Sequence, residues 1–316
     1  MAVSPVGLGC WQFSGGKGII GGFWQGLEPE VERDIVKTSV DGGINWFDTA
    51  EAYGWGRSEE ALRSALKSVG VTPNIESTPD PRYVATKWFP FFRFASSMRR
   101  TIAARRAKLG EYPIDLYQIH APASFSRMPV QMAVLAKLID EGQIRRAGVS
   151  NFSASQMEQA YRELKKQGHT LVSNQVRYSL LDRRIERNGV LDTAARLGMT
   201  IIAYSPLEQG ILTGKFHDDP EIVKRRPGPR KYMKTFKPEG LDRSRPLIEL
   251  LKRVGSGHGV SAAQVALRWV VQFHGERVVA IPGASSQSQA AQNAGTLSFT
   301  LTREELDRID SASRAL

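Results

Sequence analysis

Four residues whose side chains can carry or stabilise a proton stand at or near the ends of short apolar runs: Asp48, Tyr53, Lys87 and His120. A tyrosine hydroxyl can give a proton to a carbonyl oxygen, although its unperturbed pKa is about 10. A nearby lysine ammonium favours the phenolate and lowers that pKa. Residues of these types would suit the reduction of a carbonyl group, in which carbon receives a hydride and oxygen receives a proton.

Each of the four residues would have its own role in such a reaction. We expect Lys87 to lower the pKa of Tyr53, and Asp48 to hold Lys87 in place and keep it charged. His120 would donate a hydrogen bond to the carbonyl oxygen. A positioned acid contributes roughly 10²- to 10⁴-fold to a rate, and stabilisation of the charge on the oxygen adds to this.

Taken alone, each of these residues also has a structural explanation. Asp48 precedes Thr49 and could cap a turn, and Tyr53 could be an aromatic residue of a loop. Lys87 could be solvated at a strand end, and His120 could have a structural role. The chemical interpretation therefore depends on a fold that brings the four side chains together.

The elements that must position these residues alternate between strand and helix along the chain. Short apolar runs predict strands, and apolar residues at helical spacing predict helices. Eight strands, each followed by a helix, favour parallel pairing through right-handed crossovers, and such units close as a (β/α)8 TIM barrel. The predicted strands are residues 6–9, 44–48, 83–87, 114–119, 144–149, 171–176, 199–204 and 278–281. The predicted helices are residues 29–40, 58–69 (with Ser58 as N-cap), 96–109, 129–141, 155–167, 190–197, 244–254, 261–273, 288–294 and 303–313, and residues 205–239 read as a long loop.

An open, doubly wound sheet is the alternative architecture. It would bind a dinucleotide at a Gly-x-Gly-x-x-Gly turn after the first strand. Gly7 and Gly9 lack the third glycine at the required spacing, and the glycines of residues 15–18 have no strand before them. No linker divides the 316 residues. We therefore expect an α/β protein with a single domain, residues 1–316, folded as a TIM barrel.

The composition is typical of a soluble globular protein with a substantial core, since 41% of the residues are hydrophobic and 24% are charged. No apolar run approaches the roughly 18 residues that predict a membrane span, and residues 1–10 do not resemble a targeting signal. Cys10 is the only cysteine, which excludes intramolecular disulfides and cysteine-based metal clusters. We expect a protein of the cytoplasm or plastid stroma, with no membrane partner and no metal.

The net charge of +11 favours an anionic ligand or reflects a basic, solvated exterior. Many of the cations fall in residues 99–108, which have a helical pattern, and in residues 224–237, where prolines and a glycine indicate a loop. A basic loop suits a polyphosphate cofactor at least as well as nucleic acid. We therefore expect no nucleic-acid partner.

A series of motifs, in order from the second predicted strand to the last, gives the chain a specific resemblance. The motifs are Asp48-Thr-Ala-Glu-Ala-Tyr53-Gly, Ala85-Thr-Lys87, Asp115-Leu-Tyr-Gln-Ile-His120, Gly148-Val-Ser-Asn151-Phe, Asn174-Gln175-Val, Ala203-Tyr204-Ser-Pro-Leu207, Gly210-Ile-Leu-Thr-Gly-Lys215 and Ile281-Pro-Gly-Ala-Ser285. With these motifs the chain resembles the aldo-keto reductases, in particular the bacterial, plant and potassium-channel β-subunit-like branches. It looks closest to plant and algal plastid-type members, some of which reduce pyridoxal.

The resemblance implies reduction of an aldehyde or ketone with NADPH, and it assigns roles to residues. The tetrad of the family is matched by Asp48, Tyr53, Lys87 and His120. The cofactor contacts are matched by Ser150, Asn151 and Gln175 at the nicotinamide carboxamide, Tyr204 stacked on the nicotinamide ring, Ser205, Leu207 and Lys215 in the segment over the pyrophosphate, and Gly283, Ser285, Gln289 and Asn293 around the adenosine phosphate and adenine.

One of these positions departs from the family pattern. Many members have an arginine at the position of Gln289 to bind the 2′-phosphate, and some branches that use NADPH have glutamine there. The change weakens the expected preference for NADPH without reversing it, and Lys215 and the basic loop are candidates for the missing charge. Gln175 could also be an amide satisfied inside the barrel. Ser285 could be the N-cap of the next helix, which is compatible with phosphate binding because a helix N-terminus favours anions.

Aromatic residues concentrate in the predicted loops on the same side as the four residues. An apolar funnel with a few polar groups is typical of a small-ligand site, and residues 91–94, Phe-Phe-Arg-Phe, are unusually bulky. A bulky aromatic mouth favours aldehydes with flat or apolar bodies, and the resemblance implies pyridoxal or another aromatic aldehyde among them. Each tryptophan could instead pack against the barrel rim. The alternative function is a nicotinamide-binding regulatory or interaction subunit, and the oligomeric state is left open. The expected pocket walls are Trp11, Trp24, Trp55 and Trp88.

Overall fold

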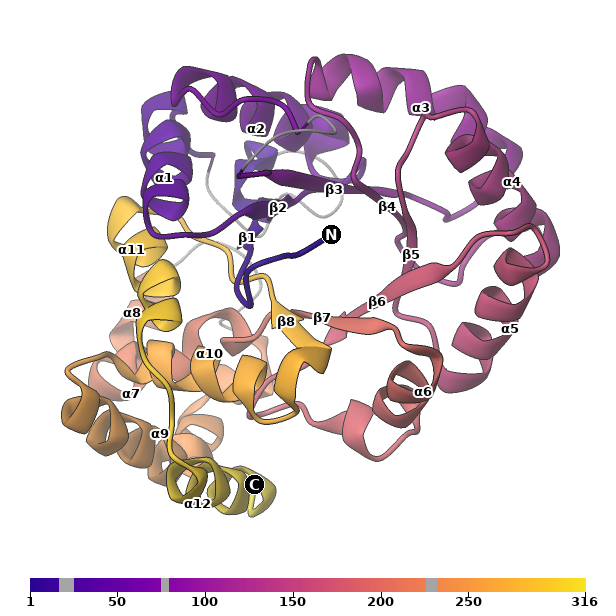
Figure 1. Cartoon of the computed structure of the whole chain (residues 1–316). Coiled ribbons are helices and arrows are strands. Elements are labelled where there is room, and N and C mark those ends of the chain that lie inside the picture. Colours follow the sequence, from indigo (N-terminus) through magenta and orange to yellow (C-terminus); the bar gives the residue numbers. More distant parts are fainter. Residues whose placement is uncertain (17–25, 75–79, 226–231) are drawn as a thin grey trace.

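Eight parallel strands form one sheet in chain order in the computed structural model, which describes residues 1–16, 26–74, 80–225 and 232–316 (Figure 1). The sheet closes into a barrel because Val6 and Gly9 pair in parallel with Ala280 and Gly283. The predicted TIM barrel is confirmed. The strands are β1 Leu8–Gly9, β2 Trp46–Asp48, β3 Tyr83–Trp88, β4 Leu116–Ile119, β5 Ala147–Ser150, β6 Leu171–Arg177, β7 Thr200–Tyr204 and β8 Val278–Ala280.

Alternate residues of each strand face the inside of the barrel, because successive side chains of a strand point to opposite faces. Asp48, Lys87 and Gln118 each stand two residues after an apolar residue of this inner face, so they point into the same interior, nearer the carboxyl ends of β2, β3 and β4. The main apolar core lies between the strands and the surrounding helices. The apolar residues inside the barrel are Trp46, Tyr83, Ala85, Leu116, Ile202, Val279 and Ile281.

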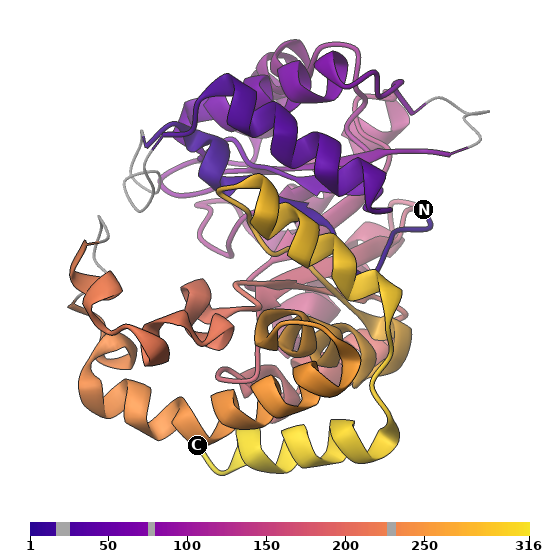
Figure 2. The same ribbon diagram turned by 90° about the vertical axis from the view of Figure 1, so that its left-hand side faces the viewer.

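Helices surround the sheet, and α12 packs on α9 at the periphery (Figures 1 and 2). Among the described residues, no helix is both long enough and apolar enough to cross a membrane. The helices are α1 Pro29–Asp41, α2 Arg57–Ser68, α3 Ser96–Leu109, α4 Met128–Asp140, α5 Ala154–Lys165, α6 Val190–Leu197, α7 Lys215–Asp218, α8 Glu221–Arg225, α9 Pro238–His258, α10 Ala262–Gln272, α11 Gln287–Gly295 and α12 Arg303–Arg314.

The start of α2 differs from the prediction, because Ser58 lies inside the helix and does not cap it. The N-cap is Gly56, whose φ of 93° suits glycine, which has no Cβ. The buried Ser58 hydroxyl donates to the Cys10 carbonyl at 2.6 Å and lies 2.8 Å from the Thr49 hydroxyl. Ser58 therefore ties α2 to the residues that follow β1 and β2, next to the site described below.

The prediction of a continuous loop over residues 205–239 is wrong in part. This stretch contains a 3-10 turn at Glu208–Thr213, α7, α8 and a second 3-10 turn at Lys234–Phe236, and α9 already begins at Pro238. Prolines and glycines indicated a loop, but the apolar residues between them bury together. Residues 226–231 of the predicted basic loop lie outside the described residues. The small core of this region is formed by Ile211, Phe216, Val223, Phe236 and Leu241.

Candidate active site

Lys87 lies at the centre of a buried polar cluster at the carboxyl ends of β2 and β3. Its side chain is fully buried, and its ammonium donates to a carboxylate oxygen of Asp48 in an ion pair. The same ammonium donates to the Thr49 carbonyl at 2.8 Å and to the Tyr53 hydroxyl at 3.4 Å. The structure therefore brings together three of the four residues that the sequence proposed for proton transfer.

Asp48 uses its second carboxylate oxygen to bind two amides. The Gln175 side-chain nitrogen donates to Oδ2 at 2.9 Å, and that of Gln118 donates to the same atom at 3.2 Å. A buried charge is tolerated when an opposite charge and hydrogen bonds compensate it, so this set fixes Asp48 and Lys87 together. Gln118 lies within the motif from Asp115 to His120, but the sequence assigned it no role, although its place two residues before His120 on the inward face of β4 was available as a signal.

Tyr53 and His120 lie side by side above this cluster, and both are half-buried. Their ring centroids are 5.8 Å apart, with the rings nearly perpendicular at 80°. On its other side Tyr53 stacks on Trp11, with centroids 6.2 Å apart. Among the described residues, the buried Nδ1 atom of His120 has no hydrogen-bond partner. The fourth predicted residue thus lies next to the other three.

Burial raises the pKa of Tyr53 above its usual value of 10, although the Lys87 ammonium acts in the lowering direction. This corrects the expectation of a net decrease. The reason is that Asp48 already neutralises Lys87, while a phenolate at Tyr53 would lose its water. Burial alone would lower the pKa of Lys87, but Asp48 and Tyr53 raise it, and the net shift is upward. Lys87 is therefore charged and Tyr53 protonated at neutral pH.

His120 is neutral at neutral pH. Burial, followed by the positive charge of Lys87, lowers the pKa of its imidazole from 6.5 to about 3. A neutral imidazole has one N–H donor and one acceptor nitrogen. His120 can therefore donate a hydrogen bond to a substrate oxygen without adding a charge to the site.

A cavity of about 380 Å³ opens above Tyr53 and His120. It is lined by Trp11 and by every residue that the sequence proposed for cofactor binding, whereas Lys87 lies below its surface. The predicted lining residues are Ser150, Asn151, Gln175, Tyr204, Ser205, Leu207, Lys215, Gly283, Ser285, Gln289 and Asn293. Five further lining residues lie in the motifs but had no assigned role: Pro206, Gly210, Thr213, Ile281 and Pro282. The sequence did not indicate the remaining ones, Gly9, Cys10, Gln12, Arg177, Gln209, Ala263 and Gln292.

A chain of hydrogen bonds crosses the cavity wall from β5 to β7. The Ser150 hydroxyl donates to the Gln175 carbonyl at 2.8 Å, and the Asn151 side-chain nitrogen donates to the Ser150 hydroxyl at 3.0 Å. The Tyr204 hydroxyl donates to the Asn151 side-chain oxygen at 3.0 Å. Asn151 has a φ of 62°, a conformation that asparagine adopts more readily than most residues. Gln175 lines the cavity and is also satisfied inside the barrel, since its side-chain nitrogen donates to Asp48.

At the other end of the cavity, the turn after β8 leads into α11. The backbone nitrogen and hydroxyl of Ser285 both donate to the side-chain oxygen of Gln289, at 2.9 and 3.1 Å. The N-cap of α11 is Ser286 and not Ser285, because the Ser286 hydroxyl accepts from the Gln289 nitrogen. A Cβ at Gly283 would lie 2.2 Å from the Gln12 side chain, so glycine allows the turn to approach Gln12 closely.

The four tryptophans proposed as pocket walls have different surroundings. Trp11 lines the cavity, whereas Trp55 is 53% exposed and lines a separate recess. The prediction for Trp88 is wrong: its side chain is fully buried in the core, and its indole nitrogen donates to the Ser97 hydroxyl at 3.1 Å. Because the preceding Lys87 faces the interior of the barrel, Trp88 must face outward, toward the helices. Trp24 lies outside the described residues.

Comparison with known proteins places the whole chain in one family. Residues 5–314 match the sequence profile of the Aldo/keto reductase family. The chain belongs to the aldo/keto reductase family. It is therefore an enzyme of the oxidoreductase class, and the predicted resemblance is confirmed.

Relatives of this aldo/keto reductase include bacterial and plant proteins. An uncharacterized oxidoreductase of Mycobacterium tuberculosis is 36% identical over 318 residues, covering 99% of this chain and 90% of the relative. The chloroplastic pyridoxal reductase of Arabidopsis thaliana is 30% identical over 323 residues, covering 99% of this chain and 84% of the relative.

Solved structures agree with this assignment. A glycerol dehydrogenase from Gluconobacter oxydans superposes with a TM-score of 0.83 at 28% identity, covering 99% of this chain and 92% of that structure. An aldo-keto reductase from Klebsiella pneumoniae, solved in complex with NADPH, superposes with a TM-score of 0.72 at 25% identity, covering 98% of this chain and 91% of that structure.

Proposed function

We propose that this enzyme uses NADPH to reduce an aldehyde or ketone and that Tyr53 gives the proton to the carbonyl oxygen. The observation that carries the proposal is the 3.4 Å contact between the Tyr53 hydroxyl and the Lys87 ammonium, with Tyr53 lining the cavity and Lys87 buried below it. A carbonyl oxygen near Tyr53 and His120 would meet two hydrogen-bond donors. Donors placed where charge develops in a transition state stabilise it strongly.

The cavity suits a dinucleotide of the NADPH type. The amide and hydroxyl chain from Ser150 to Tyr204 fits a carboxamide and a flat ring at one end, and the turn that carries Gly283 and Ser285 lines the other. The lining also carries Lys215, whose charge suits a phosphate group. The related Klebsiella enzyme was solved with NADPH. When bound, the nicotinamide supplies a hydride to the carbonyl carbon.

The residues of this chain prepare the site for proton transfer. Tyr53 keeps its proton at neutral pH, because its usual pKa of about 10 lies well above 7 and burial raises that pKa further. As negative charge develops on the substrate oxygen, the Tyr53 proton moves toward it, and Lys87 stabilises the phenolate that remains. Asp48 holds Lys87 in place through their ion pair. His120 donates its single N–H to the same substrate oxygen.

Gln289 stands where many members of the family have an arginine, so the preference for NADPH over NADH needs a test of its own. Lys215 supplies a positive charge in the cavity lining, and we propose that it and the basic loop favour the additional phosphate of NADPH. The ratio of kcat/KM for NADPH to that for NADH measures this preference. Equal values for the two cofactors would overturn it while leaving the role of Tyr53 intact.

We propose a flat aromatic aldehyde as substrate, with pyridoxal as the specific candidate. Trp11 and Tyr53 stack at the floor of the cavity, and His120 presents its ring on the other side of Tyr53. Aromatic walls of this kind favour aromatic ligands through stacking and edge contacts. The pyridoxal reductase of Arabidopsis, 30% identical to this chain, supports the choice of pyridoxal.

A regulatory or interaction subunit that binds a nicotinamide cofactor is the second candidate function. The observation that favours it is a group of exposed phenylalanines, with Phe92 85% exposed and both Phe94 and Phe125 59% exposed. The ring of Phe125 lies within 6.3 Å of Phe92 and 5.5 Å of Phe94, measured between centroids. Exposed apolar groups of this kind mark interaction sites in many proteins.

Consumption of NADPH by the purified protein, measured over a panel of aldehydes that includes pyridoxal and 4-nitrobenzaldehyde, tests the main proposal. We expect turnover without any added partner, whereas an interaction subunit would show none. Substitution Tyr53→Phe should lower kcat by about 10²- to 10⁴-fold and leave NADPH binding unchanged, because only the acidic hydroxyl is lost. Full activity in this variant would falsify the role of Tyr53 as the acid.

A further inference from the structure

Large apolar side chains are exposed at two loops that follow neighbouring strands. Phe92 is 85% exposed, and Phe94 and Phe125 are each 59% exposed. The loops are joined, since the Phe125 nitrogen donates to the Arg93 carbonyl at 3.1 Å. The ring of Phe125 packs against those of Phe92 and Phe94. These rings therefore form one apolar patch, which consists of Phe91, Phe92, Phe94 and Phe125.

Phe92 occupies a backbone position that suits glycine better than phenylalanine. The Arg93 nitrogen donates to the Pro90 carbonyl at 3.1 Å and closes a tight turn. Phe92 is the third residue of this turn and has a φ of 57°, which bulky residues rarely adopt. Strained residues of this kind cluster at functional sites. Because the ring is almost fully exposed, burial within this chain does not offset the cost of the conformation.

The two segments that carry the patch contain basic residues and no acidic ones. Residues 88–110 and 120–139 include no aspartate or glutamate. Arg99 is bound by a glutamate just after α4. Arg100 on α3 and Arg127 before α4 are exposed, and neither side chain makes an ion pair within the described ranges. These segments therefore combine exposed aromatic rings with uncompensated positive charge.

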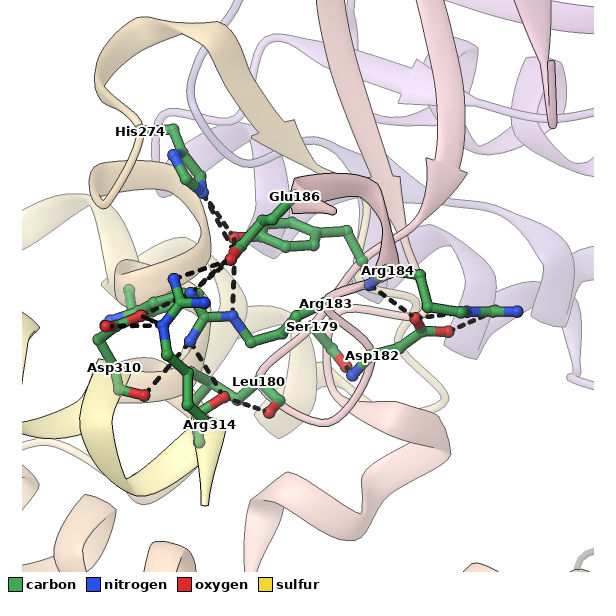
Figure 3. Close-up of polar contacts among 12 residues, drawn as sticks. Ser179, Leu180, Asp182, Arg183, Arg184, Glu186, His274, Asp310 and Arg314 are labelled. Carbon is green, nitrogen blue, oxygen red and sulfur yellow. Dashed lines mark hydrogen bonds and ion pairs between the residues drawn. The ribbon is translucent and has the colours of Figure 1, made fainter. Parts of the chain in front are cut away.

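Another arginine-rich region, at the loop after β6 and at α12, is different. Figure 3 shows Arg184 bound to Asp182, and Arg314 bound to Asp310. None of the exposed large apolar side chains among the described residues belongs to residues 180–187 or to α12. Figure 1 places α12 on the opposite side of the barrel from α3 and α4. These arginines are therefore neutralised, whereas those at the patch are not and are accompanied by apolar rings.

We propose that the apolar patch, together with Arg100 and Arg127, attaches this protein to the surface of an anionic lipid bilayer. Exposed aromatic rings enter the boundary between headgroups and acyl chains, and neighbouring cations are attracted to anionic lipids. A bilayer of this kind offers both contacts over a wide area. The expectation of no membrane partner rested on the absence of a spanning segment, and attachment to a surface needs none.

The patch lies at the active-site end of the barrel, because its loops follow the carboxyl ends of β3 and β4. Tyr53 and His120 line the cavity at the same end. Attachment therefore brings the active site toward the lipid surface. It requires neither NADPH nor a carbonyl substrate, so it is independent of the proposed reduction.

Flotation of the purified protein with lipid vesicles tests this attachment. One set of vesicles contains equal parts of phosphatidylcholine and phosphatidylglycerol, and the other contains phosphatidylcholine alone. We expect the protein to bind the anionic vesicles more tightly by about 10-fold or more, because each cation near an anionic surface contributes to binding. High salt should release the protein from the anionic vesicles, since salt screens exposed charges.

Two variants separate the contribution of the rings from that of the charges. Phe92→Ala should weaken binding to the anionic vesicles by about 5-fold or more, because the most exposed ring is lost. Arg100→Gln together with Arg127→Gln should weaken it by about 10- to 30-fold. All three side chains are exposed, so the melting temperature of each variant should remain close to that of the wild type.

Two control variants remove exposed residues of the same types outside the patch. Tyr232→Ala removes a ring that is 73% exposed. Arg184→Gln together with Arg187→Gln removes two exposed arginines of the loop after β6, and so changes the net charge as much as the substitutions at the patch. We expect both controls to bind the anionic vesicles like the wild type.

Three results would overturn the attachment: a folded wild type that does not float with anionic vesicles, wild-type binding by Phe92→Ala, or an equal loss of binding in the two arginine pairs. Dimers that Phe92→Ala dissociates, seen by sedimentation of a protein that binds no vesicles, would assign the patch to a second copy of the chain instead. Reduction of aldehydes by a protein that binds no vesicles would leave the proposed function intact.

Discussion

Trp11 and Trp88 show how residues of one type can have different roles. Trp11 lines the cavity and stacks on Tyr53, whereas Trp88 is fully buried between β3 and the helices. We predict that Trp88→Ala destabilises the protein by about 3–5 kcal/mol without changing KM for an aromatic aldehyde. Trp11→Ala should raise that KM severalfold and change stability much less. Urea unfolding and steady-state kinetics on both variants measure this, and the opposite pattern would contradict the assignment.

At the same scale, the sequence predicted the tetrad well and its electrostatics less well. Types and order along the chain indicated Asp48, Tyr53, Lys87 and His120, because each lies at or shortly after the carboxyl end of a strand and these ends converge in a barrel. The sign of the shift at Tyr53 was wrong, since its burial and the neutralisation of Lys87 by Asp48 depend on distances that no motif records. The alternation of β3 alone would have placed Trp88 outside the site.

At the scale of elements, most helices were predicted to within a few residues. The exceptions are the region after β7 and α9, which spans Pro238–His258 where the prediction was residues 244–254. The prolines and glycines of residues 205–239 indicated a loop, yet Ile211, Phe216 and Phe236 belong to a small core of their own. Local composition gives no signal for such a core, because its members meet only after the chain has folded back on itself. The left-handed residues of this segment could not be predicted either, since two of them are serine and glutamine.

Glu186 connects two elements of the fold through contacts whose strength depends on pH. This carboxylate accepts from Tyr178 on one side and from Arg183 and Arg314 on the other, and so joins the end of β6 to α12. Burial raises its pKa, but hydrogen bonds from His274, Tyr178 and Arg183 outweigh this, and the pKa falls from 4.5 to about 2. Since the pKa is lower in the folded state, Glu186 stabilises the fold above about pH 4.5, and this contribution is lost as the pH falls toward 2.

We therefore predict that Glu186→Gln removes part of the acid sensitivity of the fold. At pH 7 the variant should be less stable than the wild type by on the order of 1–3 kcal/mol, and the difference should shrink between pH 4.5 and pH 2. Urea unfolding at a series of pH values measures it. A difference that stays constant over this range would show that the Glu186 charge does not contribute in this way.

At the scale of the whole molecule, the closure of the barrel depends on residues near the two ends of the chain. The Gly7 nitrogen donates to the Ala280 carbonyl at 2.8 Å, and the Gly9 nitrogen donates to the Pro282 carbonyl at 3.1 Å. Because β1 has only two residues, few bonds hold this junction. Contacts between residues so distant in sequence form late and cooperatively in folding, so the junction is a sensitive point for global stability.

Gly9 allows the two strands to approach at this junction. A Cβ at this position would lie 2.7 Å from the Ile281 carbonyl oxygen, closer than Cβ atoms in proteins come to a backbone atom of another strand. We predict that Gly9→Ala lowers the free energy of unfolding by about 1–3 kcal/mol and speeds hydrogen exchange at the Gly7 and Ala280 amides, whose bonds cross the junction.

Gly257→Ala is the control, because Gly257 lies in α9 and a Cβ there would meet nothing within 4 Å. The control should be neutral or more stable by up to about 1 kcal/mol, since alanine favours a helix over glycine. If wild type and Gly9→Ala have the same free energy of unfolding and the same hydrogen-exchange rates, the strands can move apart at this point at no cost in stability. The barrel would then not depend on close approach at Gly9.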